Sequence, residues 1–130
     1  MHLLLLLTCL NFHSADAATP KKVHLRYEMW AQGRLVCNGE REFASGQEYL
    51  VCEQSMGVNK TLVRLKTKAR AKNQFLVTGK IEDVAAGGEI QVISSPQVMA
   101  LAGEEASIEV GEVGDDSSHM KMIVTAQPKD

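Results

Sequence analysis

The sequence contains few of the residues from which enzymes and metal sites are usually built. It has three cysteines, four histidines and one tryptophan in 130 residues. No two cysteines are spaced as C-x-x-C, and neither Cys37 nor Cys52 has a histidine beside it, which argues against common zinc and dithiol motifs. A glycine-rich phosphate-binding loop is also absent from the sequence. We therefore predict a protein without enzymatic activity, metal or cofactor.

Long apolar runs are equally scarce. Leu3–Leu10 is one such run, but it is too short to span a bilayer as a stable helix. Ala15-Asp16-Ala17 follows it and has the small residues of a signal-peptide cleavage site. We therefore predict a signal peptide over residues 1–17, a single domain over residues 18–130, and a periplasmic or secreted protein without a transmembrane segment.

Two cysteines, Cys37 and Cys52, lie beyond the predicted signal peptide. An even pair of cysteines in an exported protein is typical of a disulfide. Two strands are expected around them, Leu35–Phe43 and Glu48–Glu53, and as a hairpin these would place the two cysteines opposite each other. In the chain-entropy model, closing a loop of about 15 residues stabilises the fold by about 3 kcal/mol.

Apolar and polar residues alternate through much of the chain, and no long helical period occurs. In Val23–Trp30 the odd-numbered residues are apolar and would face a core, whereas the even-numbered residues would face water. Turn residues recur about every 8–12 residues, as in all-β domains. We predict an all-β fold, either a small antiparallel β-sandwich or a barrel-like sheet. Similar turns within Val36–Glu53 and Ile93–Val110 leave open an arrangement of two related halves.

A row of cations distinguishes Thr61–Lys72. Its basic residues are Arg64, Lys66, Lys68, Arg70 and Lys72. They alternate with small or apolar residues, so a strand would carry one wholly basic face, although the pattern also permits a helix. Such a face would attract anionic lipid, lipopolysaccharide or glycan polymer, whereas nucleic acid is disfavoured by export and by the lack of interleaved aromatics. The structural alternative is a solvated face, or lysines that block unwanted pairing at a sheet edge.

Charge is unevenly distributed between the two halves of the chain. Residues 18–72 contain 11 Lys and Arg against 5 Asp and Glu, whereas residues 73–130 contain 3 against 10. This asymmetry indicates two faces that attract each other or two different partners. The candidate contacts with a protein partner are Trp30, on the polar face of the first strand, and the acidic residues Glu104, Glu105 and Glu109.

The segment Ile90–Glu112 has the most informative residue order. Within it, Val98–Leu101 is a short apolar run, Gly103 marks a turn, and the alternation in Glu105–Val110 is that of a half-buried antiparallel strand. Pro96 lacks an N–H group and therefore fits a sheet edge or a strand start. We predict a hairpin in which the two strands flank Gly103.

The residues of this predicted hairpin carry a family resemblance. The string Ser94–Glu112 follows the pattern S-S-P-x-V-x-x-x-x-G-x-x-A-x-I-x-V-G-E. It resembles the C-terminal region of bacterial secretins, the outer-membrane gate proteins of type II and type III secretion and of type IV pili. The resemblance extends over Gln91–Pro128 and implies a secretin-like β module with an envelope or secretion-system protein as its partner.

We thus predict an exported, non-enzymatic β module for protein–protein interaction or for envelope or secretion-system assembly. Two alternatives are a periplasmic inhibitor of an envelope hydrolase, with Gln54–Lys60 as its loop, and a binder of anionic envelope polymer through the basic strand. His24 and His119 are expected to be solvated rather than catalytic. The spacing of Asp115, Asp116 and His119 matches no calcium loop. The sequence leaves the oligomeric state open.

Overall fold

The computed structural model describes residues 19–111 and 119–129, and these residues form nine β-strands and no helix. The strands are β1 (Lys22–Ala31), β2 (Arg34–Ala44), β3 (Glu48–Met56), β4 (Asn59–Ala71), β5 (Gln74–Val84), β6 (Ile90–Ser94), β7 (Gln97–Leu101), β8 (Glu105–Val110) and β9 (Met120–Lys129). Within those two ranges the chain therefore contains no helix that could span a bilayer. The predicted signal peptide, Glu112, Asp115 and Asp116 lie outside the described residues.

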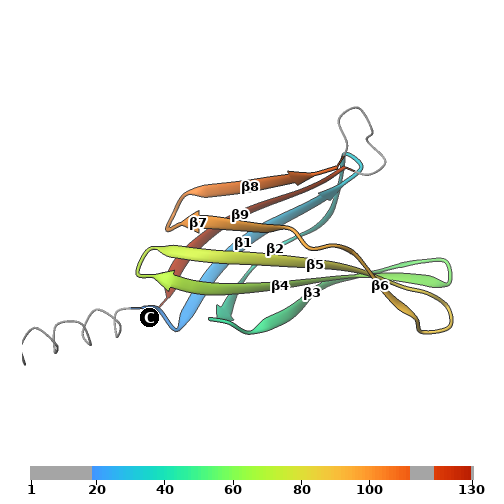
Figure 1. Ribbon diagram of the computed structural model, residues 1–130, viewed down its shortest axis with the longest axis horizontal. Helices are drawn as coiled ribbons and strands as arrows, with labels where there is room; N and C mark the ends of the chain where they lie inside the picture. Colours follow the sequence, from blue (N-terminus) through green and yellow to red (C-terminus); the bar gives the residue numbers. More distant parts are fainter. Residues whose placement is uncertain (1–18, 112–118, 130) are drawn as a thin grey trace, which may run out of the picture.

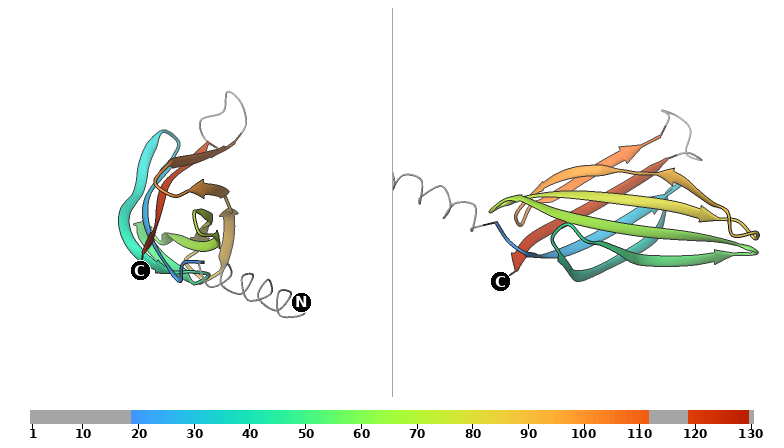
Figure 2. Two further views of the ribbon diagram at one scale, coloured as in Figure 1. Left: turned by 90° about the vertical axis from the view of Figure 1, so that its left-hand side faces the viewer. Right: turned by 60° about the horizontal axis from the view of Figure 1, so that its bottom comes forward.

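The strands form two antiparallel sheets (Figure 1). Sheet A has the order β2-β1-β9-β8, and sheet B has the order β3-β4-β5 with both β6 and β7 paired to β5. The end-on view in Figure 2 shows the sheets curving around one interior without closing. The predicted all-β fold is therefore confirmed as a β-sandwich, and the barrel-like alternative is not adopted.

Strands β6 and β7 lie end to end along one edge of β5. Strand β6 pairs with the carboxyl-terminal part of β5, and β7 pairs with Gln74–Thr78. Pro96 lies between the two strands, and its carbonyl accepts a hydrogen bond of 2.8 Å from the Gly79 amide. Because proline has no N–H to offer a neighbouring strand, its position at the sheet edge agrees with the prediction.

The hairpin predicted around Gly103 is wrong, because its two strands belong to different sheets. Strand β7 pairs with β5 in sheet B, whereas β8 pairs with β9 in sheet A. The amide of Gly103 donates to the Ala126 carbonyl at 2.8 Å, and the amide of Ala102 donates to the Asn73 carbonyl at 2.9 Å. These bonds hold the turn against β9 and against the turn between β4 and β5, and the chain crosses from sheet B to sheet A here.

The hairpin predicted around the cysteines is wrong for the same reason. Strand β2 pairs with β1 in sheet A, and β3 pairs with β4 in sheet B. At the turn between them, the Gly46 amide donates to the Thr67 carbonyl and the Ser45 hydroxyl accepts from the Ala69 amide, each at 2.9 Å. Gly46 and Gly103 both have positive φ, of 84° and 77°. The two similar turns noted in the sequence are therefore both crossings between sheets.

The predicted disulfide between Cys37 and Cys52 is confirmed, and it joins the two sheets rather than two arms of a hairpin. The cysteine Cα atoms are 6.0 Å apart, one on β2 and the other on β3. Beside them, the Gln54 side-chain amide donates to the Val36 carbonyl at 2.7 Å. A second hydrogen bond joins the two strands nearer the turn, where the Ala44 amide donates to the Tyr49 hydroxyl at 3.0 Å. Strands β2 and β3 are thus held together by the disulfide and by these two hydrogen bonds.

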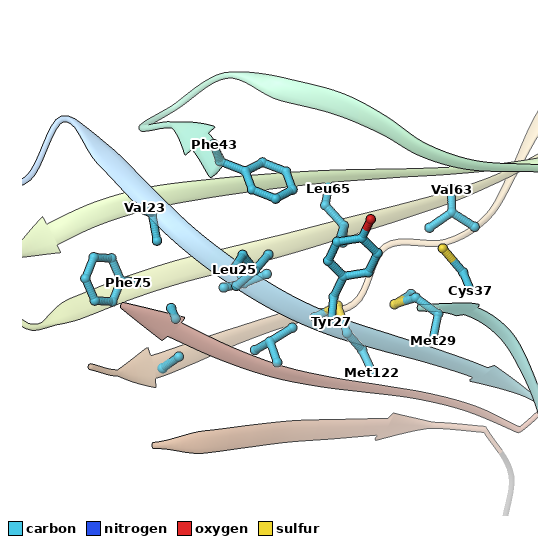
Figure 3. Packing of buried hydrophobic residues seen from close by; sticks show 14 of the residues in the cluster. Val23, Leu25, Tyr27, Met29, Cys37, Phe43, Val63, Leu65, Phe75 and Met122 are labelled. Atoms are coloured by element: carbon cyan, nitrogen blue, oxygen red, sulfur yellow. The ribbon is translucent and has the colours of Figure 1, made fainter. Parts of the chain in front are cut away.

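The core lies between the inner faces of the two sheets (Figure 3). The odd-numbered residues of β1 point into it, as the alternation predicts. The largest buried side chains include Phe43 from sheet A, and Leu65 and Phe75 from sheet B. Thr67 is also fully buried, and its hydroxyl has no hydrogen-bond partner among the described residues.

The turns between β3 and β4 and between β5 and β6 project beyond the end of sheet A (Figure 1). The segment Gln54–Lys60, predicted as a loop, consists of strand residues around a two-residue turn of Gly57 and Val58. Gly57 has a φ of 66°, which permits so tight a turn. The loop prediction is therefore wrong, and the hydrolase inhibitor stays a prediction from the sequence.

Candidate functional site

The predicted basic strand is confirmed as β4, and its cations lie on the outer face of sheet B. The residues between them, Val63, Leu65, Thr67 and Ala69, are buried. Because successive strand residues point to opposite faces, Lys66, Lys68 and Arg70 point outward and are spaced about 7 Å apart. We call these three residues the basic row. Lys72 follows in the turn between β4 and β5.

Salt bridges neutralise the cations at one end of this face but not those of the basic row. Arg64 Nε lies 2.7 Å from a carboxylate oxygen of Glu82, and Lys80 Nζ lies 3.9 Å from one of Glu48. Within residues 19–111 and 119–129, the basic row and Lys72 make no ion pair. The cross-strand neighbours of Lys66 and Lys68 on β5 are uncharged, namely a threonine and a leucine. On β3, Lys66 lies across from Glu48, the carboxylate that faces Lys80.

The outer face of sheet A contrasts with this arrangement. Its ion pairs are Lys22 with Glu42 at 3.4 Å, Arg26 with Glu40 at 3.4 Å, and Lys121 with Glu109 at 3.5 Å. The two histidines within residues 19–111 and 119–129 also face carboxylates. His24 Nε2 lies 2.7 Å from Glu40, and this hydrogen bond is the main cause that lowers the pKa of the Glu40 carboxyl below its usual value. His119 Nε2 lies 3.3 Å from Glu109.

The position of β4 in its sheet removes one structural explanation of the cations. Lysines at a sheet edge prevent unwanted strand pairing, but β4 lies between β3 and β5. Strand β3 pairs with β4 only as far as Lys66. Beyond that point, the turn at Ser45 and Gly46 forms hydrogen bonds with Thr67 and Ala69 along the same side of β4. The basic row therefore does not protect an edge.

The predicted partner-binding residues do not form one site. Trp30 and Glu109 lie on the outer face of sheet A, on either side of Lys121 in the cross-strand register. Glu105 is at the other end of β8, and Glu104 is in the preceding turn. The Trp30 indole N–H donates to Glu28 at 3.1 Å, which fixes the ring against its own strand.

Trp30 also lines a shallow hollow. The residues around it are Trp30, Gly33, His119, Lys121 and Ile123. Its volume of about 260 Å³ is below the roughly 300–1,000 Å³ typical of small-molecule sites, and both of its basic side chains already face Glu109. In the part of the chain that the structure describes, no cluster of three or more His, Cys, Asp or Glu side chains could hold a metal ion.

One exposed feature was missed in the sequence. Strand β6 forms part of the outer edge of sheet B, and Ile90, Val92 and Ile93 on it are 51–59% exposed. The signal that could have revealed it is the order I-Q-V-I-S, which contains no charge and few polar side chains. Exposed edge strands usually carry charges, prolines or bulges that prevent pairing with another strand. Strand β6 has no charge, although its register with β5 shifts at Ile93.

A comparison of the chain with protein-family models, curated proteins and solved structures found no match. The resemblance of Ser94–Glu112 to secretins therefore stays a prediction from the sequence.

Proposed function

We propose that this protein is a non-enzymatic binding module that recognises a polyanionic ligand through the basic row. The observation that supports this proposal is the unneutralised charge of Lys66, Lys68 and Arg70 on a central strand. Evenly spaced cations that make no ion pair among the described residues attract the negative groups of a ligand and release its bound counterions. Within the row, Lys66 has an acidic cross-strand neighbour, Glu48 on β3. The same residues would contribute nothing to packing, because they face away from the core.

A charge-driven interaction of this kind depends strongly on salt. Exposed charges are screened over about 8 Å at physiological ionic strength, so binding should be tight only at low salt. Export of the chain, predicted from residues 1–17, would bring the basic row to the anionic polymers of the envelope or of the outside. The secretin resemblance would further place the module beside a secretion or pilus component.

The proposal is tested by measuring binding to dextran sulfate, a simple polyanion, as a function of salt. Reversing two charges of the basic row, with Lys66→Glu and Lys68→Glu together, should weaken binding roughly tenfold or more. The matched control, Arg34→Glu with Lys129→Glu, makes the same change of net charge on sheet A and should bind nearly as the natural chain does. Equal losses in the two variants would mean that only net charge matters, and the proposal would fail.

A second candidate function, protein–protein interaction, is favoured by strand β6. An edge strand without charges can add a partner strand through main-chain hydrogen bonds, while pockets for its side chains provide specificity. Ile90 and Val92 are exposed on one face of β6, so a partner strand carrying apolar residues would bury them together. This mechanism is the one that assembly into an envelope complex would use.

Self-association tests this second function, because β6 of another copy is itself a suitable partner strand. Sedimentation equilibrium of the natural chain should show a weak dimer at high concentration, whereas Val92→Lys should remain monomeric. The new lysine would lie across from Glu82, so the fold should tolerate it. Monomers throughout, for both proteins, would remove the support for pairing between copies through this edge.

A further inference from the structure

A second row of exposed side chains runs beside the basic row on the same face of sheet B. It consists of Leu76 on β5 and of Met99 and Leu101 on β7, and we call it the apolar row. Leu76 is half-buried, whereas Met99 and Leu101 are 49% and 44% exposed. Their neighbours Phe75, Val77 and Ala100 are fully buried, so the apolar row points outward.

The strand register brings the two rows together. Lys68 pairs with Leu76, and Leu76 pairs with Met99, so the three side chains form one line across the sheet. Neighbouring strands lie about 4.8 Å apart, which places Met99 about 10 Å from the basic row. At the end of the face, the bond from the Ala102 amide to the Asn73 carbonyl brings the turn that carries Lys72 beside Leu101.

We propose that the outer face of sheet B docks onto an anionic lipid surface, an inference that rests on the proposed function and names its ligand. The basic row and Lys72 would contact the phosphate groups, and Met99 and Leu101 would enter the boundary between headgroups and acyl chains. A polyanionic polymer would account for the cations alone. It would leave the exposed methionine and leucine of β7 in water, whereas a lipid surface would bury them.

The chemistry of this face matches that of peripheral proteins that bind membranes reversibly. Attraction to anionic lipid accounts for about a fivefold increase in binding for each Lys or Arg close to the surface. Burying part of two side chains the size of methionine and leucine would add roughly another tenfold. Neither contribution is large, so binding should need both rows and should be reversed by salt.

Binding of the full chain to vesicles tests this inference. The vesicles would contain phosphatidylglycerol and phosphatidylcholine, or phosphatidylcholine alone, and cosedimentation would give the partition coefficient. Lys66→Ala with Lys68→Ala should lower binding to the anionic vesicles about 25-fold, the product of two fivefold factors. Met99→Ser with Leu101→Ser should lower it roughly tenfold. Phosphatidylcholine alone should bind the natural chain only weakly.

The control for the apolar row is Leu35→Ser with Val110→Ser, which removes two comparably exposed side chains from sheet A. This variant should bind anionic vesicles like the natural chain, and thermal unfolding checks that all variants are folded. If dextran sulfate binds through Lys66 and Lys68 but anionic vesicles do not bind, the lipid inference is overturned and the proposed function stands. Vesicle binding that is insensitive to Met99→Ser with Leu101→Ser would also overturn it. Failure to bind either ligand would overturn both.

Discussion

Reduction of the disulfide between Cys37 and Cys52 offers a quantitative test of how the sandwich is held together. The bond joins β2 to β3, strands that make no ladder with each other because each belongs to a different sheet. Without it, the two strands keep a hydrogen bond from Gln54 to Val36 beside the cysteines and another from Ala44 to Tyr49 near the turn. Reduction should therefore release the crossing between the sheets without removing any buried side chain.

The expected loss follows from the loop that the disulfide closes. The cysteines are 15 residues apart, and in the chain-entropy model such a loop corresponds to about 3 kcal/mol of stability at 25 °C. A domain of this size is usually stable by about 5–15 kcal/mol. The reduced protein should therefore still fold, with a melting temperature lower by roughly 10–20 °C.

Urea unfolding of the oxidised and reduced proteins, followed by circular dichroism, measures this difference directly. The reduced protein should unfold at lower urea, and its denaturant slope should rise because its unfolded chain is more expanded. Gln54→Ala in the oxidised protein is the control and should cost about 1 kcal/mol. A change on reduction smaller than that of this control would refute the reasoning that the disulfide constrains the crossing.

Three further predictions concern the core. Alanine at Gly39 would place its Cβ 2.5 Å from the Tyr27 hydroxyl oxygen, so Gly39→Ala should lower the free energy of unfolding by about 1–3 kcal/mol in urea, whereas Gly87→Ala, in open space, should change it little. The buried hydroxyl of Thr67 has no hydrogen-bond partner among the described residues, which costs about 1 kcal/mol of stability. Thr67→Val removes this hydroxyl and should therefore raise the melting temperature by several degrees. No rise would mean that the hydroxyl has a hydrogen-bond partner. Burial raises the pKa of Tyr27 above the ordinary tyrosine value of 10.0, so the unfolded chain ionises first and stability should fall above about pH 10. Urea unfolding between pH 9 and 11 (the range set by that pKa) should show a smaller fall for Tyr27→Phe.

The local features of this fold could be predicted because they depend on neighbours in the sequence. Alternation identified β1 and assigned its odd-numbered residues to the core. It also identified the basic strand Thr61–Lys72, which overlaps β4 from Thr61 to Ala71, although β4 begins earlier, at Asn59. The pairing of Cys37 with Cys52 followed from the presence of two cysteines beyond the predicted signal peptide.

The features that could not be predicted depend on which strands pair. A strand, a glycine turn and a second strand have the same sequence pattern whether the two strands pair as a hairpin or belong to different sheets. Gly46 and Gly103 belong to crossings because their amides bond to Thr67 and Ala126 on other strands. The apolar row could not be predicted for the same reason. Met99 lies in line with Lys68, two strands away, only because of the register of β4, β5 and β7.

The most direct test of the basic row as a binding site is a titration of isotope-labelled protein with dextran sulfate, followed by amide chemical shifts. We predict that shifts change around Lys66–Lys72 and at the neighbouring Leu76, and that they fade as salt is raised. The amides of β1 and β9 on sheet A should change little. Shifts centred on Trp30 and Glu109, or spread evenly over both sheets, would contradict the assignment of the binding site to sheet B.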